Sequence, residues 1–409
     1  MLDVRLSARV IAATLAAPVL DEIRHTGATE HGAQRMLAKG QLVAMALEAI
    51  DRRQANLMKQ EMLAAGGDVA VSHGICGETV DETRAVLVGT RRQFDAFMAR
   101  LAEEPFDLPA VAGAIRTALD GYARRHFEIP VRGGHLAVGP KPALVGVINV
   151  TPDSFSDGGL YATPAAAVER GLGLVAGGAD LLDVGGESTR PGSDPVDEKT
   201  ELARVLPVIE ALASKAGVPV SIDTRRAAVA REALAAGAAV VNDVTGLQGD
   251  AEMARVAAGA GAAVIIMHML GEPKTMQVRP HYDNLMADIA RYLRRGVQAA
   301  LDAGVPGEQI IVDPGIGFGK TTAHNVRILA RLAELRTLGR PILVGVSRKR
   351  FIGDLTGVAA PAERTYGTAA ACAMAVAGGA LLLRVHDVAE MRQALAVAAA
   401  VTESAESLS

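Results

Sequence analysis

A junction that recurs in the last two thirds of the chain constrains the fold more than any other feature. A helix-like segment ends in Ala and Gly, and an apolar run begins within one or two residues. The junction occurs at Val175-Ala-Gly-Gly-Ala, Leu234-Ala-Ala-Gly-Ala, Ala257-Ala-Gly-Ala-Gly-Ala and Val376-Ala-Gly-Gly-Ala. Glycine ends helices because it adopts the left-handed backbone conformation without a steric cost. The repetition predicts one helix–strand unit that is used many times.

Eight apolar segments have the length and composition of buried strands: 143–150, 179–186, 219–223, 238–244, 262–269, 309–313, 341–347 and 380–386. Eight such units in roughly 260 residues match the size of a (β/α)8 (TIM) barrel. An open doubly wound sheet is the alternative, but the Gly-x-Gly-x-x-Gly that usually follows its first strand is absent here. We therefore predict an α/β fold with a barrel over residues 139–403.

The first 138 residues have a different pattern and predict a separate, smaller α/β (α+β) domain. Strands are expected at 41–49, 68–75 and 83–89, and helices at 52–65, 91–103 and 109–125, from Gly and Pro at the segment ends. Residues 21–40 have no clear pattern. The histidines of this region lack the spacing of metal ligands, so the sequence assigns the domain no chemistry.

Composition narrows the class of partner. The net charge of −4 disfavours duplex DNA and anionic membrane surfaces, so neither nucleic acid nor membrane is an expected partner. No apolar run reaches the length of a transmembrane helix. The two cysteines, Cys76 and Cys372, are far apart, which excludes a disulfide framework and favours the reducing cytoplasm.

Every predicted barrel strand ends in polar residues. These are Asn149, 187–192, 223–225, 242–243, His268, 313–320, 347–349 and 384–387. The active sites of such barrels lie where the carboxyl ends of the strands converge, so these side chains are expected to form one site.

The strand ends supply two kinds of group. Asp223, Asn242 and Asp313 are acceptors at or just inside the strand ends, which suits a neutral ligand with several N–H donors, such as a 2-amino-4-oxo heterocycle. Cations stand at other ends: Arg190, Arg348, Lys349, Arg384 and His386. Two of these cationic clusters follow strands seven and eight, where barrels commonly bind phosphate. The alternative is a solvated rim of cations paired with local acids.

Five motifs resemble those of dihydropteroate synthases, in that family's order. They are Asn149-Val-Thr-Pro-Asp-Ser-Phe-Ser-Asp-Gly-Gly, Gly185-Gly-Glu-Ser-Thr-Arg-Pro-Gly, Asp313-Pro-Gly-Ile-Gly-Phe-Gly-Lys, Ser347-Arg-Lys and Arg384-Val-His-Asp. The resemblance covers about residues 141–390 and leaves out residues 1–138. It implies a cytoplasmic, homodimeric, Mg²⁺-dependent transferase of folate biosynthesis. Such an enzyme couples 6-hydroxymethyl-7,8-dihydropterin pyrophosphate with 4-aminobenzoate, and it releases pyrophosphate and 7,8-dihydropteroate.

The resemblance also implies roles for individual residues. The expected pterin-binding residues are Asp223, Asn242, Asp313, Lys349 and Met267. Those for pyrophosphate are Asn149, which also binds the metal, with Arg190, Arg384 and His386. Those for 4-aminobenzoate are Thr189, Pro191, Phe318, Ser347 and Phe155. The expected catalytic residues are Lys349, Arg384, His386 and Asp223.

Two other readings are possible. Methyltetrahydrofolate–corrinoid methyltransferases share a pterin-binding barrel but lack the Thr-Pro-Asp-Ser-Phe loop and the Arg-Val-His motif. A non-catalytic pterin-binding homologue that acts as a partner or regulatory subunit is the other reading, which the loss of a strand-end residue would have favoured. Leu270 stands where the resembling family commonly has Gln, and this leaves the contacts of the fifth loop open.

Overall fold

The computed structural model describes residues 16–76, 80–151, 163–187, 196–272 and 274–406. Contacts divide the chain into two compact units. One is Met1–Leu119 with Glu403–Ser409, and the other is Asp120–Thr402. No helix of the described residues is both long and apolar enough to cross a membrane.

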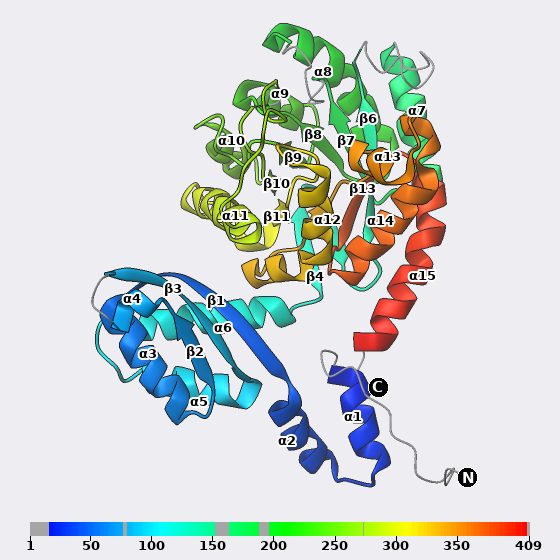
Figure 1. Cartoon of the computed structure of the whole chain (residues 1–409). Coiled ribbons are helices and arrows are strands. Elements are labelled where there is room, and N and C mark those ends of the chain that lie inside the picture. Colours follow the sequence, from blue (N-terminus) through cyan, green and yellow to red (C-terminus); the bar gives the residue numbers. More distant parts are fainter. Residues whose placement is uncertain (1–15, 77–79, 152–162, 188–195, 273, 407–409) are drawn as a thin grey trace. The chain divides into compact units, whose positions relative to one another are not determined.

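The second unit is built on an eight-stranded parallel sheet that closes on itself (Figure 1). Its strands are β6 (Ala143–Asn149), β7 (Leu181–Gly185), β8 (Val220–Asp223), β9 (Val240–Asp243), β10 (Ala263–Met267), β11 (Ile310–Asp313), β12 (Leu343–Val344) and β13 (Leu382–Val385). The order is β11-β10-β9-β8-β7-β6-β13-β12. A parallel bridge between Val312 and Ile342 joins the two ends of that order. The predicted (β/α)8 barrel is therefore confirmed.

The helices surround the strands on the outside (Figure 1). They are α7 (Pro164–Ala176), α8 (Glu198–Lys215), α9 (Ala227–Ala235), α10 (Met253–Gly259), α11 (Leu285–Asp302), α12 (Thr322–Ala330), α13 (Arg350–Thr356), α14 (Thr365–Ala377) and α15 (Val388–Glu406). The recurring glycines do what the sequence predicts. Gly178 and Gly379 have φ of +99° and +95°. The next amide in each case, of Ala179 or Ala380, donates to the carbonyl five residues earlier.

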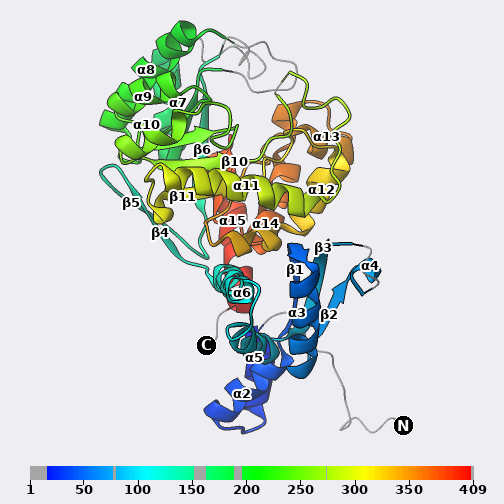
Figure 2. The ribbon, with the colours of Figure 1, turned by 90° about the vertical axis from the view of Figure 1, so that its left-hand side faces the viewer.

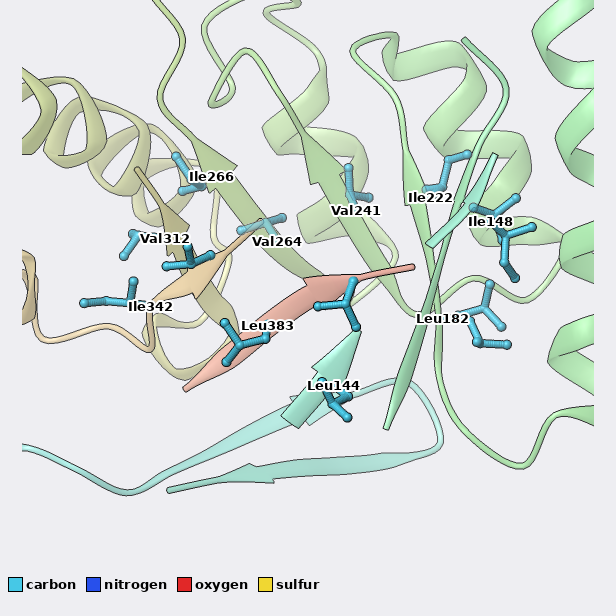
Figure 3. Close-up of a cluster of buried hydrophobic side chains, with 14 of the residues drawn as sticks. Leu144, Ile148, Leu182, Ile222, Val241, Val264, Ile266, Val312, Ile342 and Leu383 are labelled. Carbon is cyan, nitrogen blue, oxygen red and sulfur yellow. The ribbon is translucent and has the colours of Figure 1, made fainter. Parts of the chain in front are cut away.

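Alternation along each strand separates two apolar layers. Leu144, Leu182, Ile222, Val241 and Leu383 belong to one buried cluster with the surrounding helices (Figure 3). The residues one position along point into the barrel and form a second cluster: Val145, Leu181, Val240, Ile265, Ile311, Leu343 and Leu382. We call this alternation the parity of a strand: every second residue faces the barrel interior. The parity therefore determines which polar residues at the strand ends face the barrel interior.

A hairpin of β4 (Phe127–Val131) and β5 (Gly134–Val138) packs into the interior layer of the barrel. Phe127, Ile129 and Leu136 are buried there with the inward side chains of the strands. Gln309 Nε2 also donates to the carbonyl oxygen of Pro130 at 3.0 Å. The predicted boundary at residue 138 thus differs from the observed division after Leu119, because the hairpin shares its core with the barrel.

The first unit contains a three-stranded antiparallel sheet in the order β1-β3-β2, and its strands lie side by side in Figure 2. Its elements are α1 (Ala16–His25), α2 (Glu30–Gly40), β1 (Leu42–Asp51), α3 (Arg52–Ala64), β2 (Asp68–Val71), α4 (His73–Cys76), β3 (Glu82–Thr90), α5 (Arg91–Leu101) and the part of α6 (Leu108–Ala123) up to Leu119. The smaller α/β unit is confirmed. The strand predicted at 68–75 is wrong beyond Val71, where the short helix α4 follows.

The core of the first unit lies on one face of this sheet. Ala85 and Leu87 of β3 are buried with Phe94 and Phe97 of α5. Val86 and Val88 alternate with them and are exposed. Capping boxes at Asp51 and Thr90 fix the starts of α3 and α5.

Candidate active site

The parity of the strands brings predicted residues from five strands to one end of the barrel interior. Asn149, Asp223, Asn242, Asp313 and Arg384 share the inward position of their strands. Met267 and His386 have the same parity on β10 and after β13. The interior is thus apolar at the hairpin end and polar at the carboxyl ends of the strands.

The centre of the site is a cation held between two acids. Arg384 Nε donates to Asp183 Oδ2 at 2.6 Å, and Arg384 Nη2 donates to Asp223 Oδ2 at 2.8 Å. Asp183 is fully buried, and its Oδ2 also accepts from Asn242 Nδ2 at 3.1 Å. This network joins β7, β8, β9 and β13 through their side chains.

Asp183 is a site residue that the sequence analysis missed. It lies inside an apolar strand, two residues before the strand end, and not in the polar loop that follows. A charged residue within a run that otherwise reads as a buried strand is the signal that could have found it, because burial of a charge requires a partner.

Burial and charge shift the protonation of this site. Burial raises the pKa of Asp223 to about 7; the charge of Arg384 opposes that rise, and the charge of Asp183 adds to it. Burial also raises the pKa of Asp313, with Lys349 opposing. Burial lowers the pKa of Lys349 to about 8, although Asp313 counteracts it. A neutral ligand that donates N–H groups would stabilise the ionised carboxylates that burial disfavours.

The loop after β11 places Asp313 and Lys349 close to an apolar cluster. Asp313 Oδ1 accepts from the amide of Gly315 at 2.7 Å. A Cβ at Gly315 would lie 1.9 Å from the carbonyl oxygen of His268, so this loop requires glycine there. Lys349 Nζ donates to the carbonyl of Ile316 and lies 4.7 Å from the ring centroid of Phe318. Phe318 packs against Val244, Met267, Met269 and Met276.

A second group lies at the ends of β12 and β13. Ser347 Oγ lies 2.9 Å from His386 Nδ1 and accepts from the His386 amide at 3.2 Å. Arg348 has φ of +60°, and its Nη2 donates to Asp387 Oδ1 at 2.6 Å. The predicted partners Ser347 and His386 are therefore brought together, and the Arg348 side chain is engaged by Asp387.

The loops after β10 and β11 are joined by a buried pair. Lys320 Nζ lies 2.8 Å from His268 Nδ1 and also donates to the Phe318 carbonyl oxygen at 3.0 Å. Burial lowers the pKa of both Lys320 and His268. The pair positions the loops of the site.

Leu270 also takes part in this loop contact, since a Cβ on Gly319 would lie 2.7 Å from its Cβ. Gln277, later in the same loop, donates to the carbonyl of Gly317. The fifth loop therefore contacts the Asp313 loop through Leu270 and Gln277.

Arg226 connects both sides of the segment 188–195. It donates to Glu187 and Glu201, and its Nη2 donates to the Val196 carbonyl oxygen at 2.6 Å. Four predicted residues, namely Phe155, Thr189, Arg190 and Pro191, lie outside the described residues.

The predicted metal ligand Asn149 ends β6, where its backbone is in register with Gly185. In the described part of the chain, no group of three or more His, Cys, Asp or Glu side chains could hold a metal ion. An amide oxygen is a donor type that Mg²⁺ accepts, and Mg²⁺ commonly takes one or two protein ligands with phosphates and waters. Asn149 thus fits an ion that arrives with a phosphorylated ligand.

The geometry defines a barrel whose strand ends combine buried acceptors with cations. Residues 145–386 match the family described as pterin binding enzymes. The chain is 47% identical over 263 residues to a dihydropteroate synthase of Synechocystis sp., a match that covers 64% of this chain and 91% of that protein. A dihydropteroate synthase structure from Xanthomonas albilineans, solved with 4-aminobenzoic acid, has 46% identity and a TM-score of 0.63. It covers 68% of this chain and 98% of the other. The chain belongs to the pterin binding enzyme family.

A longer relative includes part of the first unit. The chain is 44% identical over 361 residues to a probable bifunctional folylpolyglutamate synthase/dihydropteroate synthase of Haloferax volcanii. That match covers 86% of this chain, which is more than the Asp120–Thr402 unit can supply. The same match covers 42% of the Haloferax protein.

We predict that Arg384→Met destabilises the barrel in a pH-dependent way. Asp183 and Asp223 lose their cation, so the native pKa of Asp223 rises further above its unfolded value. The variant therefore loses more stability as pH rises. Breaking a buried ion pair costs about 3–5 kcal/mol, and we expect that loss at pH 8 and a smaller one at pH 5, measured by urea denaturation.

Arg392→Met is the matched control, because Arg392 pairs with Asp180 at 2.7 Å and its side chain is 28% exposed against 23% for Arg384. Its expected cost is about 1 kcal/mol or less at both pH values. An equal loss in the two variants would contradict the central role of Arg384.

Proposed function

We propose that this chain is a dihydropteroate synthase. The reaction couples 6-hydroxymethyl-7,8-dihydropterin pyrophosphate with 4-aminobenzoate, and it yields 7,8-dihydropteroate and pyrophosphate. The observation that supports it best is the acceptor set of Asp223, Asn242 and Asp313, of which Asn242 and Asp313 are buried, beside Lys349 and Arg384. The relatives of this chain include proteins named dihydropteroate synthases.

The pterin would enter the polar layer of the barrel. Its amino group and ring N–H groups are donors, and Asp223, Asn242 and Asp313 are the acceptors that the strands present. Lys349 supplies a donor for the carbonyl side of the ring. Met267, in the apolar cluster with Phe318, offers a surface for the face of the heterocycle. Burial strengthens each of these hydrogen bonds because the local dielectric constant is low.

The chemical barrier lies in breaking the bond between the methylene carbon and the leaving pyrophosphate. The amino group of 4-aminobenzoate is uncharged near pH 7, so its attack on the methylene carbon needs no general base. The arylammonium formed by that attack then releases a proton to water. Cationic groups lower the barrier by stabilising the charge that develops on the departing pyrophosphate. Arg384 on β13 and His386, which follows that strand, are the cations proposed for that role. Arg190, which lies outside the described residues, is proposed to join them.

Mg²⁺ is proposed as the cofactor, with Asn149 as its protein ligand. Bound Mg²⁺ would neutralise charge on the pyrophosphate and thereby make it a better leaving group. Asn149 contributes an amide oxygen at the end of β6, and His386 is held in orientation by Ser347 at the end of β13. The ends of the strands therefore set the positions of Asn149 and His386, and the loops that follow do not.

4-Aminobenzoate is proposed to bind beside this centre. Phe318 and Ser347 are the two described members of its predicted pocket, and Phe155, Thr189 and Pro191 are the others. The Phe318 ring, which contacts the Lys349 ammonium group, offers an apolar edge next to the pterin site. This arrangement would put the arylamine near the methylene carbon that it attacks.

A non-catalytic pterin-binding homologue is the second candidate. Nothing in the described site favours it, since every predicted residue there is present and engaged or positioned on the inward face of its strand. The two candidates differ in turnover and agree in pterin binding.

We predict that the purified chain releases pyrophosphate only when both substrates and Mg²⁺ are present. Asp313→Asn should abolish release by replacing an acceptor with a donor, at a cost of about 2–4 kcal/mol. Asp302→Asn, at the end of α11 and outside the site, is the control and should keep full activity. Pterin binding without turnover, measured by calorimetry and pyrophosphate release together, would favour the non-catalytic homologue.

We further propose a homodimer. Helix α14 carries no charged residue, yet Tyr366 and Met374 on it are 89% and 59% exposed, and Val397 and Val401 of α15 are also exposed. A group of four exposed apolar side chains on two helices suits an interface between two copies of this chain. Sedimentation equilibrium should give a dimer for the wild type and a monomer for Tyr366→Lys/Met374→Lys. Leu172→Lys on α7 is the control, and a monomeric wild type would contradict the proposal.

The cytoplasm is the proposed location. Cys372 is buried and unpaired, and the chain has only one other cysteine, which suits a reducing compartment. Cell fractionation should place the activity with cytoplasmic markers, and activity in an extracellular fraction would contradict this.

A further inference from the structure

A buried charge inside strand β7 has no role in the proposed contacts with the substrates. Asp183 is fully buried, and its Oδ1 has no hydrogen-bond partner among the residues that the structure describes. On grounds of stability alone an apolar residue would serve better at this position, since replacing buried ion pairs with apolar residues is often stabilising. An unpaired buried carboxylate oxygen in a native fold calls for a functional reason.

The hydrogen bonds of Asp183 fix the orientation of an amide. Its Oδ2 accepts from Arg384 Nε at 2.6 Å, as expected of an ionised carboxylate. An ionised carboxylate has no proton to donate, so the Asn242 atom at 3.1 Å must be the nitrogen. Asn242 Oδ1 is then the amide atom left for a ligand. Without Asp183, the two ends of the Asn242 amide would be nearly equivalent, and the position could present either a donor or an acceptor.

Asp183 also fixes Arg384. The guanidinium is held by two acids on neighbouring strands, with Nε on Asp183 and Nη2 on Asp223. Gly185 of β7 is in register with Asp223, so Asp183 lies one inward position deeper in the barrel. The two acids therefore hold the guanidinium at two different depths of the barrel interior.

We propose that Asp183 is a positioning residue that sets the donor and acceptor pattern of the pterin site, by turning Asn242 Oδ1 toward the ligand and by fixing Arg384 beside Asp223. The inference rests on the proposed function for the identity of the ligand. It also explains why the site would prefer a 2-amino heterocycle to the analogue that has a carbonyl group at position 2. The 2-amino group can donate to Asn242 Oδ1, and a carbonyl group cannot.

The charge of Asp183 has a second effect, on Asp223. The groups that act on the Asp223 carboxyl are Arg384 on β13, Asp183 on β7, Glu201 on α8, Asp243 on β9 and Lys349 before α13. Among these, Arg384 lowers the pKa of Asp223, and the three acids raise it. Removing the charge of Asp183 should therefore move that pKa down from about 7, and Arg384 would remain free to pair with Asp223 alone.

The test is Asp183→Asn, with pterin affinity measured by calorimetry from pH 5.5 to 8.5, using 6-hydroxymethylpterin and its 2-oxo analogue. Wild-type affinity for the pterin should rise with pH through about 7, as Asp223 loses its proton. In the variant this midpoint should fall by about one unit, since a nearby charge has been removed. The preference for the 2-amino ligand should drop about tenfold, the equivalent of one hydrogen bond to a fixed acceptor.

Ser221→Ala is the matched control. Ser221 is fully buried and is in register with Asp183 on the adjacent strand, and its Oγ has no hydrogen-bond partner within the described part of the chain. It should change neither the pH midpoint nor the ligand preference. If Asp183→Asn lowers only the melting temperature and keeps both binding readouts at wild-type values, the residue is merely structural and the proposal fails.

A second variant covers the case in which Asp183→Asn does not fold. Asn242→Asp places a carboxyl beside Asp183, and only its protonated form can donate to that neighbour. Compared with the wild type at the same pH, its pterin affinity should be nearly normal at pH 5.5 and much weaker at pH 8, where the new carboxyl is ionised and cannot donate to Asp183. A ratio of variant to wild-type affinity that stays the same from pH 5.5 to pH 8 would overturn the proposal. Because all readouts are of binding, a chain that binds pterin without turnover would refute the synthase activity and leave this inference standing.

Discussion

The ion pairs of Arg384 with Asp183 and Asp223 are the interaction on which the site depends. These three charged groups lie inside a barrel whose interior is apolar at the hairpin end. None of the three charges would be stable there without the others. Because the partners come from β7, β8 and β13, the geometry of the pairs follows from the register of the sheet. The protonation of Asp223 and the orientation of Asn242 both follow from these contacts.

The apolar half of the barrel supports this polar layer from below. The hairpin β4–β5 fills the end of the barrel opposite the site with Phe127, Ile129 and Leu136. Water is therefore excluded on the hairpin side of Asp183. The low dielectric constant there strengthens the ion pairs, and it also raises the free-energy cost of removing one partner from a pair. The same physical condition that makes the acids expensive to bury makes them selective for a ligand that donates hydrogen bonds.

Much of this could be predicted from the sequence, because strand ends and strand interiors have different chemistry. Asn149, Asp223, Asn242, Asp313 and Arg384 were predictable as strand-end residues, and their common parity brings them together. Asp183 was not, because its partners are 59 and 201 residues away in the chain, and no local pattern shows which distant strand supplies a cation. The hairpin was assigned to the first domain for a similar reason: its apolar residues show that it is buried, but not against which core.

Co-crystallisation of the chain with a 7,8-dihydropterin tests the central claim most directly. The account predicts that the heterocycle lies within the polar layer of the barrel, with its N–H groups within hydrogen-bond distance of Asp223, Asn242 Oδ1 and Asp313. A pterin bound outside the strand ends, or one that faces the nitrogen of the Asn242 amide, would contradict it.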